Sequence, residues 1–298
     1  QQPSRPRVGR AVFAVLAACA LIAGAWAMRP QAATVTPPPP PDPLGAEVAR
    51  TVKELEVKID QGPVASIDAL LAAEASFPHR AEWVATRGRV NAALRKEIAR
   101  QVAASDVEGA EQTLAQLVRL GALPDDDALV TATRKAAFAS RNGMVRVGEV
   151  YVDRYEYPNR AGGVPATKVD WADAVALCTG VGKHLCTEQE WELVCRSGGG
   201  AFPYGATFEK ARCATKDPKR RGPSKSGERA LCATSEGVFD LSGNVAEWTA
   251  SPLREGAPQR VIRGGSFKQK GEQVSCQARD YLLPGLGGAP HLGLRCCL

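Results

Sequence analysis

The chain has 298 residues, of which 44% are hydrophobic and 23% are charged, and this is the composition of an ordinary globular protein. The length allows two domains. The formal net charge of +6 is modest and gives no indication of a nucleic-acid partner.

The number and positions of the cysteines indicate the cellular compartment of the protein. One of the nine, Cys19, lies in an apolar run, and the other eight lie between 178 and 297. An even set confined to one region indicates a disulfide framework and an oxidising compartment. A metal site is the alternative, but the chain has no CxxC pair, and its three histidines (His79, His184 and His291) are far apart. We therefore expect disulfides.

The N-terminal region predicts attachment to a membrane. Residues 11–28 carry no charge and are just long enough to cross a bilayer as a transmembrane helix. The arginines before them predict a cytoplasmic tail over 1–10 and a periplasmic or extracellular position for the rest, as in a single-pass membrane protein. A cleaved signal peptide is the alternative, because Ala25-Trp26-Ala27 has the form of a cleavage site. Residues 29–44 form a proline-rich linker, which is expected to be stiff and extended.

Residues 45–141 are predicted to be an all-α stalk or a set of helical hairpins. Val48, Val52, Leu55 and Ile59 recur at helical spacing. Further helices are expected over 66–75, 80–104, 107–120 and 125–140. Nothing in this region resembles a catalytic group, so a packing scaffold is favoured, with a peptide-binding groove as the alternative.

At Gly143 the helical spacing of apolar residues ends. Alternating valines between 145 and 152 predict a strand, and Asp170 is placed to cap a helix that reaches Cys178. Thr187 and Glu190 form a capping box, so a second short helix is expected from there to about Gly198.

A basic loop follows the glycine-rich turn after this helix. Its cationic residues are Lys216, Lys219, Arg220, Arg221 and Lys225. Such a run is most often a solvated loop, and a site for an anionic ligand is the alternative.

Six segments carry a family resemblance. In order they read VYVDRYEYPN, VDWADAVALC, GKHLCTEQEWELVC, GVFDLSGNVAEW, RVIRGGSF and LGLRC. Together they resemble the formylglycine-generating-enzyme (sulfatase-modifying factor) family over residues 143–298, and six ordered motifs are more specific than any one of them. The resemblance implies an α+β, C-type-lectin-like domain with little regular secondary structure, placed after the transmembrane helix and the all-α segment.

The resemblance also implies two structural disulfides, Cys178–Cys296 and Cys195–Cys276. Four cysteines lie outside the family pattern, and we expect them to pair as Cys213–Cys232 and Cys186–Cys297.

A calcium loop of the family has a counterpart in GVFDLSGNVAEW. Matching the motif assigns the side chains of Asp240 and Glu247 and the main-chain oxygens of Gly243 and Val245 to a structural calcium ion, which prefers closely spaced oxygen ligands. The alternative is a buried turn whose carboxylates accept hydrogen bonds from main-chain amides.

The catalytic chemistry of the family has no counterpart. The oxidases that the chain resembles hold copper(I) with two cysteines after RGGS, because a soft metal needs thiolates. Residues 267–275, at the corresponding place, contain no cysteine, so no copper and no catalytic residue are expected.

The sequence therefore predicts a membrane-anchored, extracytoplasmic binding, scaffold or sensor protein, of bacterial type, with a protein or glycan ligand and no nucleic acid. If a cytoplasmic portion precedes Gln1, the domain would be the sensor of a receptor such as a bacterial serine/threonine kinase. The alternative function is a divergent oxidase that acts on a protein cysteine and takes its metal ligands from the extra cysteines.

Overall fold

The computed structural model describes residues 42, 44–121, 127–286 and 288–298. The predicted transmembrane helix at 11–28 lies outside these residues, as does most of the linker. Within the described ranges, no helix combines the length and the apolar character that a bilayer span requires. A division of the chain falls between Glu47 and Val48, and Val48–Leu298 is one compact unit that contains the elements of the domain.

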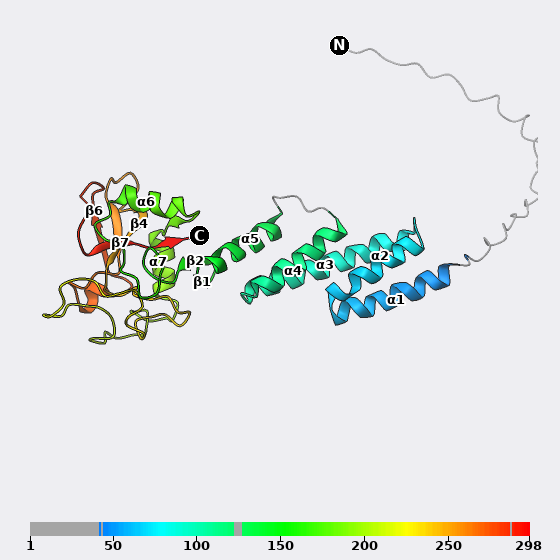
Figure 1. Ribbon diagram of the computed structural model, residues 1–298, viewed down its shortest axis with the longest axis horizontal. Coiled ribbons are helices and arrows are strands. Elements are labelled where there is room, and N and C mark those ends of the chain that lie inside the picture. Colours follow the sequence, from blue (N-terminus) through cyan, green and yellow to red (C-terminus); the bar gives the residue numbers. More distant parts are fainter. Residues whose placement is uncertain (1–41, 43, 122–126, 287) are drawn as a thin grey trace, which may run out of the picture. The chain divides into compact units, whose positions relative to one another are not determined.

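The helices expected between 45 and 141 are present (Figure 1). They are α1 (Gly45–Gln61), the 3-10 turn η1 (Pro63–Ser66), α2 (Ile67–Ser76), α3 (Ala81–Ala103), α4 (Val107–Leu120) and α5 (Ala128–Arg141). Asp106 caps α4 by accepting a hydrogen bond from the Gly109 amide at 3.1 Å. Leu94, Ile98 and Leu117 belong to the buried apolar cluster of these helices. The amphipathic pattern of the sequence is thus used for helix-on-helix packing.

Residues 144–298 form two small sheets and two short helices. The first sheet has the order β1-β2-β8-β3 and is antiparallel. Its strands are β1 (Met144–Val147), β2 (Val150–Asp153), β3 (His184–Leu185) and β8 (Cys296–Cys297). The alternating valines are therefore divided between two strands of a hairpin, with Val147 opposite Val150 and Gly148 in the turn at a φ of 59°.

The second sheet has the order β6-β5-β4-β7, in which β4 and β7 are parallel and the other pairs antiparallel. Its strands are β4 (Ala246–Pro252), β5 (Arg260–Arg263), β6 (Arg279–Leu282) and β7 (Leu292–Leu294). The short helices are α6 (Trp171–Gly180) and α7 (Glu188–Cys195), and a 3-10 turn, η2, spans Gly271–Val274. The domain is thus a mixed helix-and-sheet fold with long irregular connections, as the sequence predicted.

Helix α7 has the predicted capping box. The Thr187 hydroxyl accepts from the Glu190 amide at 3.2 Å, and the Glu190 carboxylate accepts from the Thr187 amide at 2.8 Å. The helix ends at Cys195 and not near Gly198, because the chain turns there, with Gly199 at a φ of 75° and its amide bonded to the Arg196 carbonyl.

The expected cap of α6 was wrong. Asp170 occupies the N-cap position of α6, but its side chain makes no capping hydrogen bond. Its Oδ1 accepts from the Gly285 amide at 2.7 Å instead. A hydrogen bond to a distant loop has therefore replaced the local one.

Four disulfides lie in the interior of the domain. They are Cys178–Cys296, Cys186–Cys297, Cys195–Cys276 and Cys213–Cys232, which are the four pairs named from the sequence. The two cysteines of β8 are adjacent, so this strand is fastened both to α6 and to the segment that precedes α7. All eight cysteines are buried among the apolar residues of the core.

Candidate functional site

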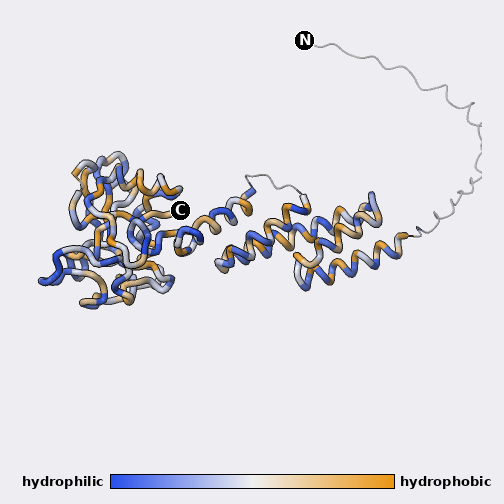
Figure 2. The backbone as a smooth tube through the Cα atoms, in the orientation of Figure 1, coloured by the Kyte–Doolittle hydropathy of each residue, from blue (hydrophilic) through white to orange (hydrophobic). Residues whose placement is uncertain are grey.

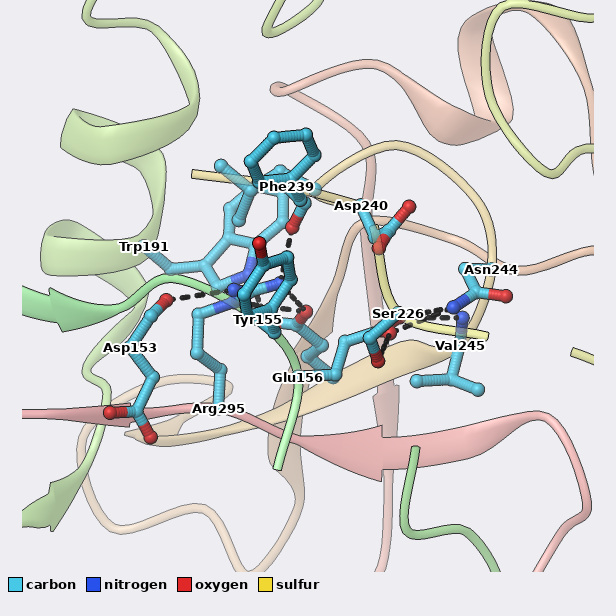
Figure 3. A network of polar contacts seen from close by, with 12 residues as sticks. Asp153, Tyr155, Glu156, Trp191, Ser226, Phe239, Asp240, Asn244, Val245 and Arg295 are labelled. Carbon is cyan, nitrogen blue, oxygen red and sulfur yellow. Dashed lines mark hydrogen bonds and ion pairs between the residues drawn. The ribbon is translucent and has the colours of Figure 1, made fainter. Parts of the chain in front are cut away.

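A polar network occupies the interior of the domain around Arg295, which follows β7 (Figure 3). The Arg295 guanidinium donates to Glu247 on β4, with Nη2 2.8 Å from Oε1. It also donates to the main-chain oxygens of Asp153, at 2.9 Å, and Phe239, at 2.8 Å. The indole of Trp191 on α7 donates to the other Glu247 oxygen at 2.6 Å. One arginine thus joins both sheets and the turn before β4.

A second buried carboxylate, Glu156, lies just after β2 and is fully enclosed. It accepts from the Asn244 amide at 2.7 Å, from the Val245 main-chain N–H at 3.2 Å and from the Ser226 hydroxyl at 3.1 Å. Burial, followed by the nearby charges of Asp240 and Glu247, raises the pKa of Glu156 well above its usual range. Glu156 therefore connects Ser226, which follows the basic loop, and the turn at 240–245 to the end of β2.

The turn at 240–247 contains the four predicted calcium ligands. Asp240 and Gly243 both have positive φ angles, of 63° and 83°, which make the turn tight. Asp240 Oδ2 accepts from the Gly227 amide at 2.7 Å, whereas its Oδ1 is buried without a hydrogen-bond partner. Burial raises the pKa of Asp240 to about 6. An unpartnered buried carboxylate oxygen suits a cation.

The other side-chain ligand fits calcium less well. Both Glu247 oxygens already accept hydrogen bonds from Arg295 and Trp191. Across the described ranges, no group of three or more His, Cys, Asp or Glu side chains could hold a metal ion, so a site at this turn would depend on the main-chain oxygens of Gly243 and Val245. Calcium at this turn stays a prediction, with Asp240 as its best-suited side chain.

A surface groove borders the second sheet and has a cavity volume of about 670 Å³. One wall consists of the edge strand β6 together with parts of β5 and β7, and the other is the segment 265–273. The polar and aromatic residues of its lining are Ser266, Lys268, Gln269, Glu272, Gln273, Arg279, Asp280, Tyr281 and His291. In the described part of the chain, β6 pairs only with β5, so one side of this strand has no neighbouring strand.

His291 is the most unusual group in the groove. Its Nδ1 is buried and has no hydrogen-bond partner. Burial, and after it the charge of Lys268, lowers the pKa of His291, so the imidazole is neutral at neutral pH. A neutral imidazole can accept one hydrogen bond and donate another, which gives the groove a polar recognition group. Arg279 contributes no free charge, because Glu188 accepts from it at 2.5 Å and 3.0 Å.

Comparison with known proteins identifies the family. Residues 108–298 match the family described as the sulfatase-modifying factor enzyme 1-like domain. The chain belongs to this family. The match is wider than the motif-bearing region that begins at 143, since it also includes α4 and α5.

The relatives of the chain include a protein named as inactive and others named as enzymes. The chain is 33% identical over 150 residues to the inactive C-alpha-formylglycine-generating enzyme 2 of Mus musculus, which covers 45% of this chain and 48% of that protein. It is 32% identical over 162 residues to the formylglycine-generating enzyme of Mus musculus, with 44% and 43% covered. The chain thus spans about half the length of these curated relatives.

Two further matches concern a kinase and a solved structure. The serine/threonine-protein kinase Pkn1 of Chlamydia trachomatis is 28% identical over 151 residues, with 44% of this chain and 24% of the kinase covered. The structure of PvdO from Pseudomonas aeruginosa aligns with a TM-score of 0.39 and 22% identity, over 45% of this chain and 61% of that one.

The cysteines of this family member do not favour the oxidase alternative. The extra cysteines that could have supplied metal ligands, namely Cys186, Cys213, Cys232 and Cys297, are all in disulfides. A disulfide sulfur is not the thiolate that copper(I) requires. At the place of the catalytic cysteines, residues 267–275 instead contain η2, and Lys268, Gln269, Glu272 and Gln273 from this segment line the groove.

Sequence reasoning missed several residues of this site. Arg295 and Glu156 lie in the recognised motifs LGLRC and VYVDRYEYPN, so membership of a motif could have marked them as important. The neighbouring sequence does not show which residues they contact. The groove residues Lys268, Tyr281 and His291 come from three separate segments that only the fold brings together.

Proposed function

We propose that residues 143–298 form a non-catalytic binding domain whose ligand occupies the groove between β6 and the segment 265–273. One observation carries the proposal: the segment that corresponds to the catalytic region of the family has no thiol and forms a wall of a 670 Å³ groove. Loops placed on a disulfide-fastened core are well suited to recognition.

The groove favours an extended protein segment as its ligand. A strand edge can form main-chain hydrogen bonds with an added strand, and pockets beside it then select the side chains of the ligand. The unpaired side of β6 provides the edge, and Tyr281, which is 53% exposed, provides an aromatic contact beside it. A glycan is the other ligand class that an exposed tyrosine and several polar groups could bind.

The domain is further proposed to act outside the cytoplasm on a membrane anchor. The uncharged segment 11–28, with arginines before it, supports the anchor. The four disulfides support an oxidising compartment, because such bonds do not persist in the cytosol of most organisms.

A second candidate function is that of a sensor domain of a receptor kinase. The match to Pkn1 favours it, since a protein named as a serine/threonine kinase shares this domain. In such a receptor, occupation of the groove would be the signal.

The test is a selection from a displayed peptide library, with a glycan array in parallel, using the 298-residue chain. Peptides bound by the wild type should lose binding in Tyr281→Ala and in Lys268→Ala, which change the groove. They should keep it in Leu193→Ala, which changes an exposed apolar residue outside the groove. Selected ligands that bind all four proteins equally would overturn the groove as the binding site.

The non-catalytic part of the proposal has its own assay. The protein, loaded with copper(I) and supplied with oxygen, is incubated with a cysteine-containing peptide whose mass is then measured. We expect an unchanged thiol, and conversion of the cysteine to an aldehyde would establish the oxidase alternative.

A further inference from the structure

The basic loop, defined here as residues 210–225, carries the whole charge excess of the protein. It contains seven lysines and arginines and one acidic residue, Asp217, an excess of six that equals the formal net charge of +6 of the entire chain. The loop, yellow-green in Figure 1, includes some of the most hydrophilic backbone in Figure 2. The remainder of the protein is therefore electrically balanced by sequence, and the loop is not.

The cations at the tip of the loop have no acidic partner in the described structure. Arg220 Nη1 donates to the Ser224 hydroxyl at 2.7 Å, and Arg221 Nη1 donates to the Pro218 carbonyl at 2.6 Å. Both acceptors are neutral, and Arg220 Nε is buried without any partner. Arginines elsewhere in the domain behave differently: Arg263, for example, lies 2.7 Å from the carboxylates of both Glu188 and Glu192. Arg212, near the start of the loop, pairs with Glu209 at 2.8 Å, so the missing counter-charges are those of the loop tip.

The loop is also held firmly at both ends, so its charges are presented in a fixed arrangement. Near its start, Cys213 is joined to Cys232. At its far end, the Ser224 amide donates to Asn244 Oδ1 at 2.8 Å, and the Asn244 amide in turn donates to Glu156. A preorganised site loses less conformational entropy when it binds a ligand than a free tail would. This anchoring distinguishes the basic loop from an ordinary solvated charge run.

One hydrogen bond connects the loop to the groove. The Lys216 amide donates to the main-chain oxygen of Gln269 at 2.8 Å, and Gln269 and its neighbour Lys268 both line the groove. A chain that lies along the edge of β6 can therefore continue over the basic loop. Carboxylate groups on that chain would supply the missing partners of Lys219, Arg220 and Arg221, and arginine pairs well with carboxylates.

From these observations we infer that the basic loop is a docking site for an acidic peptide segment that continues from the groove. The inference rests on the proposed function for the groove and adds the charge of the ligand. Opposite charges at the rim of an interface act mainly on the association rate, the salt dependence and the choice of partner.

The probe is a fluorescein-labelled decaglutamate peptide, and its anisotropy is measured against the 298-residue chain at low and at high ionic strength. The test variant reverses three charges, Lys219→Glu, Arg220→Glu and Arg221→Glu, and the hydrogen bonds that the two arginines make are to neutral acceptors. The matched control reverses three exposed lysines outside the loop, Lys53→Glu, Lys58→Glu and Lys96→Glu, and so changes the net charge by the same amount.

We expect the wild type to bind decaglutamate at low salt and to weaken as salt rises, because salt screens exposed charges. The loop variant should lose at least about tenfold in affinity, whereas the control should stay within about twofold, because only the loop variant lacks the rim charges. An equal loss in both variants, or no loss in the loop variant, would overturn the inference. Failure to bind decaglutamate together with loop-dependent binding of heparin would also overturn it and would assign the loop to sulfated glycans.

Failure of the inference can be separated from failure of the proposed function. Suppose that the loop variant binds decaglutamate normally while Tyr281→Ala still abolishes binding of library peptides. The groove is then supported as the ligand site, and the acidic docking site is rejected. If instead the loop variant no longer binds decaglutamate while the groove variants still bind every selected peptide, the groove is rejected as the ligand site. The basic loop then remains as a separate anion-binding site.

Discussion

Arg295 and Glu247 form an ion pair in the interior of the domain, with Arg295 Nη2 2.8 Å from Glu247 Oε1 and side chains that are 0% and 1% exposed. The pair joins the C-terminal end of the chain to β4. Because Trp191 donates to the same carboxylate, α7 is connected to the pair as well. An interior pair of this kind is a weak source of net stability, but the loss of one partner leaves the other charged and buried.

Replacing Arg295 by methionine should therefore lower the free energy of unfolding by about 3–5 kcal/mol, the usual cost of an uncompensated buried charge. The measurement is urea unfolding followed by tryptophan fluorescence. The double variant Arg295→Met/Glu247→Leu should regain much of the loss, since neither charge remains. If Arg295→Met does not fold, Glu247→Gln supplies the same comparison from the other side. A single variant as stable as the wild type would contradict this account of the pair.

The disulfides should differ in their contributions according to the loops they close. Cys186–Cys297 joins residues 111 apart, whereas Cys213–Cys232 joins residues 19 apart. The chain-entropy estimate gives about 4.8 kcal/mol for the longer loop and about 3.2 kcal/mol for the shorter. Paired alanine variants compared by urea unfolding should show this order. A larger loss on removing Cys213–Cys232 would mean that the bond acts mainly on the folded basic loop and not on the unfolded chain.

Local features of the domain were predictable from the sequence, and long-range ones mostly were not. The capping box at Thr187 and Glu190 depends on residues three apart, so its pattern is legible in the sequence. The pairing of Cys178 with Cys296 followed only from the family resemblance. Glu247 was assigned to calcium by matching GVFDLSGNVAEW to the calcium loop of the family. Its arginine partner lies 48 residues away, and only the fold brings the two together.

The groove could not be predicted from the sequence for a related reason. Its walls come from the segments at 262–273, 278–282 and 289–292. The motifs RVIRGGSF and LGLRC overlap the first and the last of these, but neither motif shows that the three segments meet. Asp170 gives the same lesson on a smaller scale, because an acidic residue before a helix predicts a cap, yet its oxygen bonds to Gly285, which is 115 residues away. A tertiary hydrogen bond can outcompete a local one when both cannot be made.

Glu188 should make the stability of the domain sensitive to acid. Its carboxylate lies 2.7 Å from Arg263 and 2.5 Å from Arg279. Burial raises the pKa of Glu188, but the two arginines more than offset it, so the pKa is lowered overall. A depressed pKa means that the stabilisation is present above the ordinary glutamate pKa and is lost as the pH falls through the folded-state value.

Glu188→Gln should therefore lower the free energy of unfolding at pH 7 by about 1.5–3 kcal/mol, the range for hydrogen bonds to charged groups. The difference from the wild type should shrink as the pH falls through the depressed folded-state pKa of Glu188, because the wild-type carboxylate then becomes protonated. Urea unfolding across this pH range measures it, with Glu255→Gln in an exposed loop as the control. A difference that stays constant with pH would show that the ion pairs are not its source.

Calcium should stabilise the protein through Asp240 if the predicted site is real. Asp240 Oδ1 is buried without a partner, so a cation there would remove an unsatisfied charge. Ligand at about 100 times its dissociation constant raises the free energy of unfolding by about 2.7 kcal/mol. The wild type should therefore melt at a higher temperature in calcium than in EDTA. Asp240→Asn, which keeps an oxygen for the Gly227 amide but loses the charge, should show little of this rise, and the exposed Asp173→Asn should show all of it.

The pH dependence of the calcium effect provides an independent check on the same carboxylate. Because burial raises the pKa of Asp240 to about 6, a proton competes with the metal ion for this side chain at mildly acidic pH. In EDTA, the raised pKa has the opposite consequence: the protonated carboxyl is the favoured buried form, so stability relative to Asp240→Asn should fall as the pH rises from about 4 to about 6. Calcium should cancel that fall at neutral pH and have little effect near pH 5. A calcium-induced shift of equal size at both pH values would show that the ion binds elsewhere.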